Sequence, residues 1–246
     1  MLKIEKFVTM SPKQWEIVIE GMRNPKNSWD RSDSYATRIE DAETHESVPF
    51  EFFVGDNDLE LMGSLAKGGP VHAKYRRMMP VWMTINAPLY WWKEFDTYKV
   101  GTVTNSCSTM HKIHAKEFTM DDFSHEHLVT EADDPECNIV LFNHTADPYD
   151  VMHLIVSMLN RARQKFLVAK SKPMKEESKR AGLVKKYWWQ MIQLLPTSYN
   201  QKRTVMLNYE VLHNIYISRR HHKLDEWHVF CDWIEELPYF DLIVNP

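Results

Sequence analysis

The side chains that could serve a ligand are concentrated in residues 71–112, which contain the densest aromatic run of the chain. This stretch combines aromatic residues with a Lys93–Glu94 pair, an Ala-Pro step and a loop of small polar residues at 101–108. Apolar walls with a few polar groups among them are the usual composition of a ligand pocket. Most aromatic stripes nevertheless belong to a protein core, so composition alone favours a core helix followed by a polar loop.

A second group of candidate residues lies near the C-terminus and comprises Asn208, Asn214, Arg219 and His222. Residues 204–220 are expected to form a helix. On an ideal helix Asn208 and Arg219 would share a face about 16 Å apart. Such a face can line an extended ligand. The alternative is a solvated basic helix end that complements the helix dipole.

Histidine spacing raises the question of a metal site. His111 and His114 are three residues apart, and His125 and His127 are two apart. Cysteine or carboxylate ligands at diagnostic spacing are missing nearby, so no metal site is expected.

Composition narrows the class of protein. The net charge of −4 and the pI near 6.3 give no global reason to expect a nucleic-acid partner. With no apolar signal core and no run of 18 apolar residues, no membrane association is expected. Seven glycines argue against a glycine-rich phosphate loop and an all-β fold. Three widely spaced cysteines indicate a reduced, cytoplasmic protein: Cys107, Cys137 and Cys231.

Periodicity and capping signals predict an α+β fold, mostly helical with a small antiparallel sheet, in a single domain over residues 1–246. Strands are expected at 2–10, 48–54 and 80–86. Helices are expected at 11–24, 58–66, 88–99, 109–118, 147–172, 175–195, 204–220 and 224–237. The second of these helices is expected to be capped by Asp56 or Asn57. The apolar sides of the first, fifth and last helices would be formed by Trp15, Ile17, Val18 and Met22, by Val151, Leu154, Ile155, Met158, Leu159, Ala162 and Phe166, and by Trp227, Phe230, Cys231 and Ile234. Residues 27–47 and 101–108 are expected to be loops, the first one mobile, and 197–203 a polar turn.

Residues 72–112 follow the order of a known motif. His72 stands fifteen residues before an Ala-Pro step, and Lys93-Glu94-Phe95-Asp96 ends the aromatic helix. Next come Thr97-Tyr98-Lys99, Thr102, Asn105, Ser106, Ser108 and Met110-His111. This stretch resembles the flavin-dependent thymidylate synthases, whose signature R-H-R-x2-S-x-N-E-x-S-x-R-Y follows a histidine, a strand, Ala-Pro and R-Q-W-F. The match requires one inserted residue before Asn105.

A second block, residues 195–235, resembles the C-terminal part of the same family. That part runs L-P, a Y-T turn, a helix with two asparagines and a catalytic arginine, then H-A-Q-x-E. This chain has Leu195-Pro196, Tyr199, Asn208, Asn214, Arg219 and then His222 to Glu226, and it keeps the spacing Asn-x5-Asn-x4-Arg. The resemblance extends over about residues 48–235.

The resemblance implies a homotetrameric α+β enzyme that binds FAD, dUMP, NADPH and methylenetetrahydrofolate. Arg219 would be the catalytic residue, orienting and polarising the uracil ring. The cofactor-binding residues would be His72, Tyr98, Lys99, Asn105, Asn208, Asn214 and His222. The substrate-binding residues would be Glu94, Thr97, Ser106, Ser108 and Arg219.

The departures from the motif concern phosphate recognition. Of the family's R-H-R only Lys99 is cationic, and lysine offers a point charge rather than a planar fork. Met110 and Ile192 stand where the family has two further arginines. Another basic residue substitutes, or the ligand differs; the candidates are Lys93, Lys99, Lys112, Arg203 and Arg220. The expected function is C5-methylation, or a related C5 modification, of a pyrimidine deoxynucleotide. The alternative is a non-catalytic or repurposed nucleotide-binding member of the fold.

Overall fold

The computed structural model describes residues 1–41, 43, 45, 47–141, 144–171, 173 and 177–244. About half of the chain is helical and the sheets are small, so the predicted α+β class is confirmed. The chain forms two compact units. The first comprises Met1, Asn86–Lys93 and Ser106–Lys202, and the second Leu2–Ile85, Glu94–Asn105 and Arg203–Pro246. Compact units are not necessarily separate domains, so the single domain stays a prediction.

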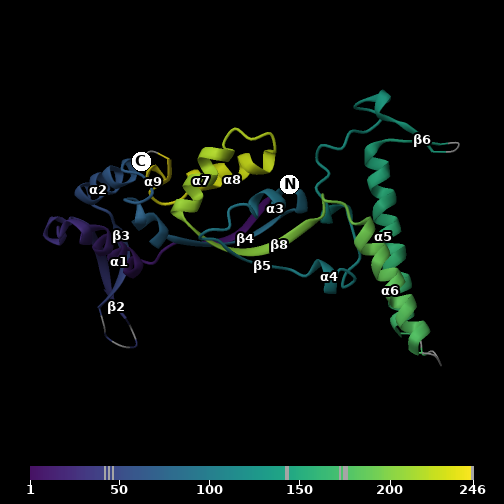
Figure 1. The fold of residues 1–246 in the computed structure, drawn as a ribbon, viewed down its shortest axis with the longest axis horizontal. Coiled ribbons are helices and arrows are strands. Elements are labelled where there is room, and N and C mark those ends of the chain that lie inside the picture. The colour runs from purple at the N-terminus through teal and green to yellow at the C-terminus, as the bar shows by residue number, and fades with distance from the viewer. Residues whose placement is uncertain are drawn as a thin grey trace. The chain divides into compact units, whose positions relative to one another are not determined.

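The second unit contains the larger part of a four-stranded sheet in the order β1 (Lys3–Val8), β4 (Pro80–Pro88), β8 (Asn200–Asn208), β5 (Val103–Ser106) (Figure 1). The turn predicted at 197–203 and the helix predicted from residue 204 are therefore wrong over β8, as is the loop predicted over β5. Val205 and Leu207 are fully buried at alternating positions, which is the period of a strand.

Helix α1 (Pro12–Arg23) begins where the Ser-Pro signal predicts it. Ser11 accepts a hydrogen bond from the Gln14 amide, and the Gln14 side chain accepts from the Ser11 amide, which completes a capping box. Trp15 and Val18 are buried as expected. Ile17, predicted on the same apolar side, is instead 56% exposed.

A hairpin of β2 (Tyr35–Glu40) and β3 (Ser47–Phe53) lies against α1. The strands are antiparallel, with a bulge between Thr37 and Arg38. The mobile loop predicted for 27–47 is thus wrong over β2; residues 42, 44 and 46 lie outside the described residues. The prediction failed because β2 exposes most of its side chains and so lacks an apolar run.

Helix α2 (Asp56–Lys67) begins two residues earlier than predicted, and its N-cap is Gly55 rather than Asp56 or Asn57. The Asp33 carboxylate accepts from the amides of Asn57 and Asp58 at 3.0 and 3.3 Å. A carboxylate from a preceding loop thus satisfies the free donors of the first turn. A Cβ at Gly55 would lie 2.2 Å from this carboxyl group, so the approach requires glycine.

The remaining helices near the candidate site are α3 (Leu89–Phe95), α7 (Tyr209–Arg219), α8 (Asp225–Glu235) and α9 (Asp241–Val244). Helix α3 starts one residue after its predicted start and stops four residues before its predicted end. Helix α8 buries Trp227, Phe230, Cys231 and Ile234, which confirms its predicted apolar face. Short 3-10 turns complete the chain: η1 (Asn24–Lys26), η2 (Trp29–Arg31), η3 (Lys74–Met78), η4 (Met120–Asp122) and η5 (Pro135–Cys137).

The first unit is built on α5 (Pro148–Ser171) and α6 (Glu177–Leu194), which pack as a helical hairpin (Figure 1). Leu159, Phe166 and Met191 are central to its core, but Leu154 and Met158, predicted on the same stripe, are exposed. Helix α4 (Thr109–Lys112) is shorter than predicted, and β6 (Ile139–Leu141) pairs antiparallel with β7 (His144–Ala146). The predicted helix ends at residues 172 and 175 lie outside the described residues.

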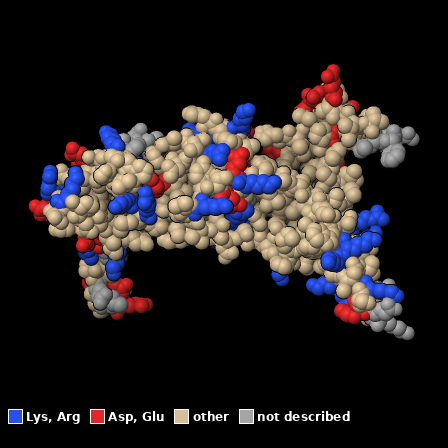
Figure 2. All heavy atoms as spheres, viewed as in Figure 1, with Lys and Arg blue, Asp and Glu red and all other residues tan. Residues whose placement is uncertain are grey.

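The α5–α6 pair is strongly basic on its solvent side, where blue side chains gather in Figure 2. Its described acidic residues are Asp150 and Glu177. Its described basic residues are Arg161, Arg163, Lys165, Lys170, Lys179, Arg180, Lys185 and Lys186. The chain's net charge of −4 therefore does not describe this part of its surface.

Candidate functional site

Arg219 is the last residue of α7, and its guanidinium is fixed by residues at and beyond the end of α3. Its Nε donates to the Tyr98 hydroxyl at 2.9 Å. Its Nη1 lies 2.9 Å from Glu94 Oε2, forming an ion pair in which both side chains are partly exposed. Residues from the two sequence segments of the resemblance therefore meet in the second unit.

Trp227 of α8 completes this cluster. Its indole Nε1 donates to Glu94 Oε2 at 2.9 Å, and the Arg219 guanidinium carbon lies 5.0 Å from its ring centroid. A cation over a tryptophan face is attracted by the ring quadrupole, so Trp227 holds both members of the ion pair. The sequence pattern predicts for Trp227 only a place on the apolar face of the helix expected at 224–237. A polar indole nitrogen on a buried helix face is the signal that could have drawn attention to it.

His222 adds a third donor to the same carboxylate. Its Nδ1 accepts from the Leu224 amide at 3.1 Å, so the proton of the neutral ring is on Nε2. Nε2 lies 3.4 Å from Glu94 Oε2. Arg219 and Glu94 balance each other's charge, so the cluster as a whole is close to neutral.

A cavity of about 280 Å³ adjoins the cluster at Tyr98. Its other lining residues are Phe95, Asp96, Lys99, Thr102 and Thr104. The Thr102 hydroxyl is buried and has no hydrogen-bond partner among the described residues. Asp96 of the lining is paired with Arg203 at 2.7 Å. Lys99 also lines the cavity, and it makes no ion pair among the described residues.

Asn208 has a different position from the one predicted. It is the N-cap of α7, and its Oδ1 accepts from the Val211 amide at 3.1 Å. The predicted shared helix face of Asn208 and Arg219 is therefore wrong, because Asn208 belongs to β8. Gly101 has φ +81°, and a Cβ there would lie 2.9 Å from Asn208 Nδ2. Asn208 thus packs against the loop that carries the cavity residues.

Other predicted residues do not join the cluster. Three of them are exposed in the second unit: Thr97, Asn105 and Asn214. The Thr97 hydroxyl donates to the main-chain carbonyl oxygen of Glu94 at 2.7 Å. His72 is exposed and lies against Gly68.

Two predicted site residues and two positions of lost arginines belong to the first unit. Ser106 is exposed, and Ser108 caps α4 by accepting from the His111 amide at 3.0 Å. Met110 is exposed, and its carbonyl oxygen accepts from Trp188. Ile192 packs against the apolar core of this unit. Neither position offers a phosphate donor side chain.

Within the part of the chain that the structure describes, no group of three or more His, Cys, Asp or Glu residues could hold a metal ion. No helix among these residues has the length and apolar character needed to cross a membrane.

No protein-family model matches this chain, and no curated protein sequence matches it. Solved structures do match. Thymidylate synthase X (ThyX) from Helicobacter pylori, with FAD and dUMP, has a TM-score of 0.54 and 14% identity, covering 99% of this chain and 96% of ThyX. A second structure of that flavin-dependent enzyme, also with FAD and dUMP, has a TM-score of 0.52 and 15% identity, covering 99% and 97%.

The chain has the fold of a flavin-dependent thymidylate synthase. The likeness extends over nearly the whole of both chains, so it includes the N-terminal residues for which the sequence showed no resemblance. At 14% and 15% identity it concerns the fold. What this chain binds and catalyses has to be argued from its own residues.

Proposed function

We infer that this protein is an FAD-dependent enzyme that modifies C5 of a pyrimidine deoxynucleotide such as dUMP, by reductive methylation or a related reaction. NADPH would be the reductant and methylenetetrahydrofolate the carbon donor. The observation that carries the proposal is the contact of Arg219 with Glu94 and Tyr98. These residues come from two distant segments that resemble one family, and they meet beside a cavity. A homotetramer in the cytoplasm is part of the same proposal.

Arg219 is the proposed catalytic residue. Nε and Nη1 are engaged with Tyr98 and Glu94, and Nη2 has no hydrogen-bond partner among the described residues. Nη2 would donate to a carbonyl oxygen of the pyrimidine and stabilise the negative charge that develops there. Glu94, Tyr98 and Trp227 are positioning residues, because they fix the guanidinium before the ligand arrives. A preorganised donor does not have to be reoriented during the reaction.

The cavity residues fit the ring part of a flavin. An engineered cavity of about 150 Å³ holds benzene, so about 280 Å³ has room for fused rings but not for a whole dinucleotide. Lys99 offers a positive charge to a polar ring edge. Tyr98, Lys99 and Thr102 would hold the flavin, while Asn208 supports the loop between them. When bound, reduced flavin supplies the hydride.

The alternative proposal is a nucleotide-binding protein that does not catalyse the reaction. It is favoured by the near-neutral charge of the Arg219 cluster and by Met110 and Ile192, neither of which can pair with phosphate. Each charge-assisted hydrogen bond lost from a phosphate is worth roughly 1.5–3 kcal/mol. Binding of a nucleotide monophosphate would then depend on the remaining cations, of which Lys99 lines the cavity.

The first experiment is the absorption spectrum of the purified protein between about 370 and 450 nm, where bound flavin absorbs. The enzyme proposal expects a yellow protein, or one that takes up added FAD with a shifted and saturable spectrum. A colourless protein that takes up no FAD would exclude the enzyme and favour the alternative. If FAD binds, NADPH oxidation with and without dUMP distinguishes substrate use from cofactor retention.

The second experiment compares two neighbouring arginines. Arg219→Ala should reduce nucleotide turnover by about 100-fold or more, since that is the usual cost of losing one charge-stabilising donor. Arg220→Ala is the matched control. Arg220 was a candidate phosphate donor in the sequence, but its guanidinium is paired with Asp232 at 2.5 Å and with Glu235 at 3.1 Å, so it is not proposed to bind the nucleotide. Equal turnover in the two variants, with both folded, would remove Arg219 from the mechanism.

A further inference from the structure

The helical hairpin of α5 and α6 carries a surface that the candidate site does not use. Its two helices contain eight basic and two acidic side chains, an excess of six positive charges. Blue side chains gather over these helices in Figure 2. Six of the cations make no ion pair among the described residues: Arg161, Arg163, Lys165, Lys170, Lys185 and Lys186. A surface with this excess of charge attracts an extended array of negative charges.

One side of α5 combines cations with exposed apolar side chains. Positions that recur at intervals of four and three residues lie on one side of a helix. In α5 they form what we call the outer stripe: Leu154, Met158, Arg161, Lys165 and Val168. The three apolar members are 50%, 46% and 60% exposed, in that order, and both cations are exposed as well. The side of α5 that faces the core is a different one, which contains Leu159 and Phe166.

The charges of the outer stripe are not balanced along the helix. Asp150 is the described carboxylate of α5, and it lies in the first turn, eleven residues before Arg161. The two backbones are therefore about 16 Å apart along the helix axis, beyond the Debye length of about 8 Å at physiological salt. The Lys165 ammonium lies 5.5 Å from the ring centroid of Tyr187, a contact that holds the side chain without neutralising it.

Helix α6 carries the same combination of side chains. Lys186 is exposed, and Leu183 and Trp189 lie three residues before and after it, so all three are on one side of the helix. Leu183 and Trp189 are exposed too. Tryptophan and lysine suit the level of lipid headgroups, because each has an apolar body and a polar end.

The aliphatic side chains distinguish between classes of polyanion. A single-stranded nucleic acid gains from aromatic rings on which its bases stack, whereas the apolar members of the outer stripe are leucine, methionine and valine. An anionic lipid surface uses both parts of the stripe, since cations meet the headgroups and aliphatic groups enter the acyl boundary. A second copy of this chain is disfavoured, because a self-complementary contact on this face would bring cations against cations.

We propose that the outer stripe of α5, together with the exposed side of α6, lies on a membrane surface that contains anionic lipids. The cations contact the headgroups, and the aliphatic side chains enter the boundary between headgroups and acyl chains. Lying on a bilayer is a different property from crossing it, for which none of the described helices is suited. The sequence predicts no membrane association because it has no long apolar run, and that feature concerns crossing only. The proposal does not depend on the function proposed for the Arg219 cluster.

The test is sedimentation of the full chain with phosphatidylcholine vesicles, with and without about 30% phosphatidylserine. We expect binding to the vesicles that contain phosphatidylserine, at least about tenfold weaker binding to phosphatidylcholine alone, and weaker binding as salt is raised. Absence of binding to the phosphatidylserine vesicles, or equal binding to both kinds of vesicle, would overturn the proposal.

Two double variants test the two parts of the stripe, and circular dichroism checks that each is folded. Arg161→Glu with Lys165→Glu should weaken binding to the phosphatidylserine vesicles at least about tenfold, and Leu154→Ser with Met158→Ser about tenfold. If the aliphatic variant binds like the wild type, the surface attracts polyanions in general and the lipid assignment is wrong. A single-stranded oligonucleotide that binds as tightly as the vesicles, and is weakened by the charge variant, would also overturn it.

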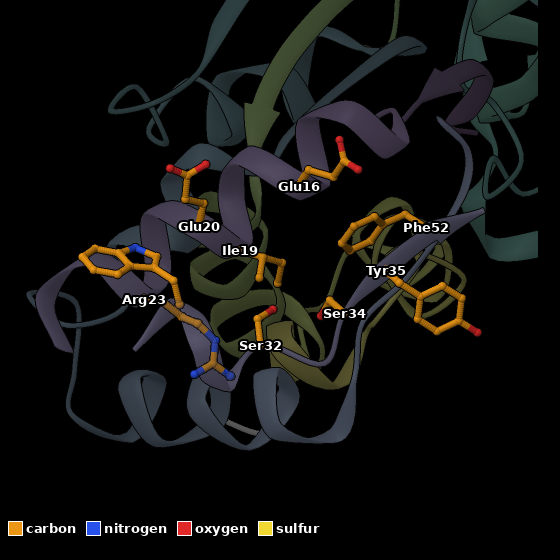
Figure 3. A pocket seen from close by; sticks show the side chains of 9 residues that line it. Glu16, Ile19, Glu20, Arg23, Ser32, Ser34, Tyr35 and Phe52 are labelled. Atoms are coloured by element: carbon orange, nitrogen blue, oxygen red, sulfur yellow. The ribbon is translucent and has the colours of Figure 1, made fainter. Parts of the chain in front are cut away.

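The matched controls are exposed residues of the second unit. Lys13→Glu with Lys26→Glu makes the same change of charge elsewhere. Ile17→Ser removes an exposed aliphatic side chain from α1, a helix whose Glu16 and Glu20 carboxylates point away from the cavity in Figure 3. Both controls should bind the phosphatidylserine vesicles like the wild type. Controls that weaken binding as much as the variants of the outer stripe would refute the location.

Discussion

Asp58 is the residue whose loss should most clearly destabilise the second unit. It is fully buried and accepts hydrogen bonds from Arg23 at 2.6 Å and from the hydroxyls of Ser32 and Ser34 at 2.7 Å. These bonds join the end of α1, the η2 loop and α2. Asp58→Ala would leave the Arg23 guanidinium buried without a counter-charge and would leave both serines without an acceptor.

The expected magnitude follows from this geometry. Removing one partner of a buried ion pair costs about 3–5 kcal/mol, because the remaining charge is uncompensated. For a chain of this size, each kcal/mol lowers the melting temperature by about 2–4 °C. The expected decrease in melting temperature is therefore about 6–20 °C, measured by circular dichroism or calorimetry.

Asp56→Ala is the matched control, since Asp56 lies in the first turn of the same helix and is exposed. It can lose only the helix-dipole contribution, which is below about 1 kcal/mol. If Asp58→Ala and Asp56→Ala differ by less than about 1 kcal/mol, the Arg23–Asp58 pair does not stabilise the fold as argued.

The same pair has a pH signature. Burial alone would raise the pKa of Asp58, but hydrogen bonds from Ser34 and Ser32, together with Arg23, outweigh it and hold the pKa below its usual value. A depressed carboxyl pKa contributes stability that is present above the unfolded pKa of about 3.9. That stability is lost as the pH falls through the lower folded pKa. The free energy of unfolding should therefore fall less steeply below about pH 4 in Asp58→Ala than in the wild type.

Three further predictions concern other parts of the chain. Gly55→Ala should lower the free energy of unfolding, measured in urea, by about 1–3 kcal/mol, because the new Cβ would lie 2.2 Å from a carboxyl group. Gly63→Ala is the control, since a Cβ there would meet nothing within 4 Å, and equal effects of the two variants would contradict this prediction. Cys107 is exposed and should react quickly with a thiol reagent. Cys231 should react slowly, because it is buried and burial raises its pKa to about 12; early labelling of Cys231 would be inconsistent with the fold. Tyr98→Phe should lower nucleotide turnover about tenfold with little change in stability, and unchanged turnover would argue against its positioning role.

The sequence predicted the helices with strong apolar stripes and clear caps. Helices α1, α5 and α8 lie close to their predicted positions because Ser11-Pro12, Pro148 and the Trp227 face are local signals. Strand β8 is predicted from the sequence as a polar turn up to residue 203 and as the start of a helix from residue 204, and both predictions are wrong. Strand β8 pairs with β4 and β5, which are distant in the sequence, so the residues of this segment alone do not reveal the pairing.

The candidate site was predicted in part. Glu94, Tyr98, Arg219 and His222 were named from the resemblance, and the structure brings them together. Trp227 was missed because its ring is part of the apolar core, and only its indole nitrogen reaches the site, where it donates to Glu94. The Arg23–Asp58 pair was also missed, since nothing in the local sequence says that two charged residues 35 positions apart become buried together.

In the proposed function, Arg219 activates a pyrimidine nucleotide beside a flavin. The most direct measurement is mass spectrometry of dUMP incubated with the FAD-loaded protein, NADPH and methylenetetrahydrofolate. We expect a nucleotide that gains a carbon at C5 with the wild type and with Arg220→Ala, and about 100-fold less of it with Arg219→Ala. Product formed by Arg219→Ala at the wild-type rate, or no product from a flavin-loaded wild type, would contradict it.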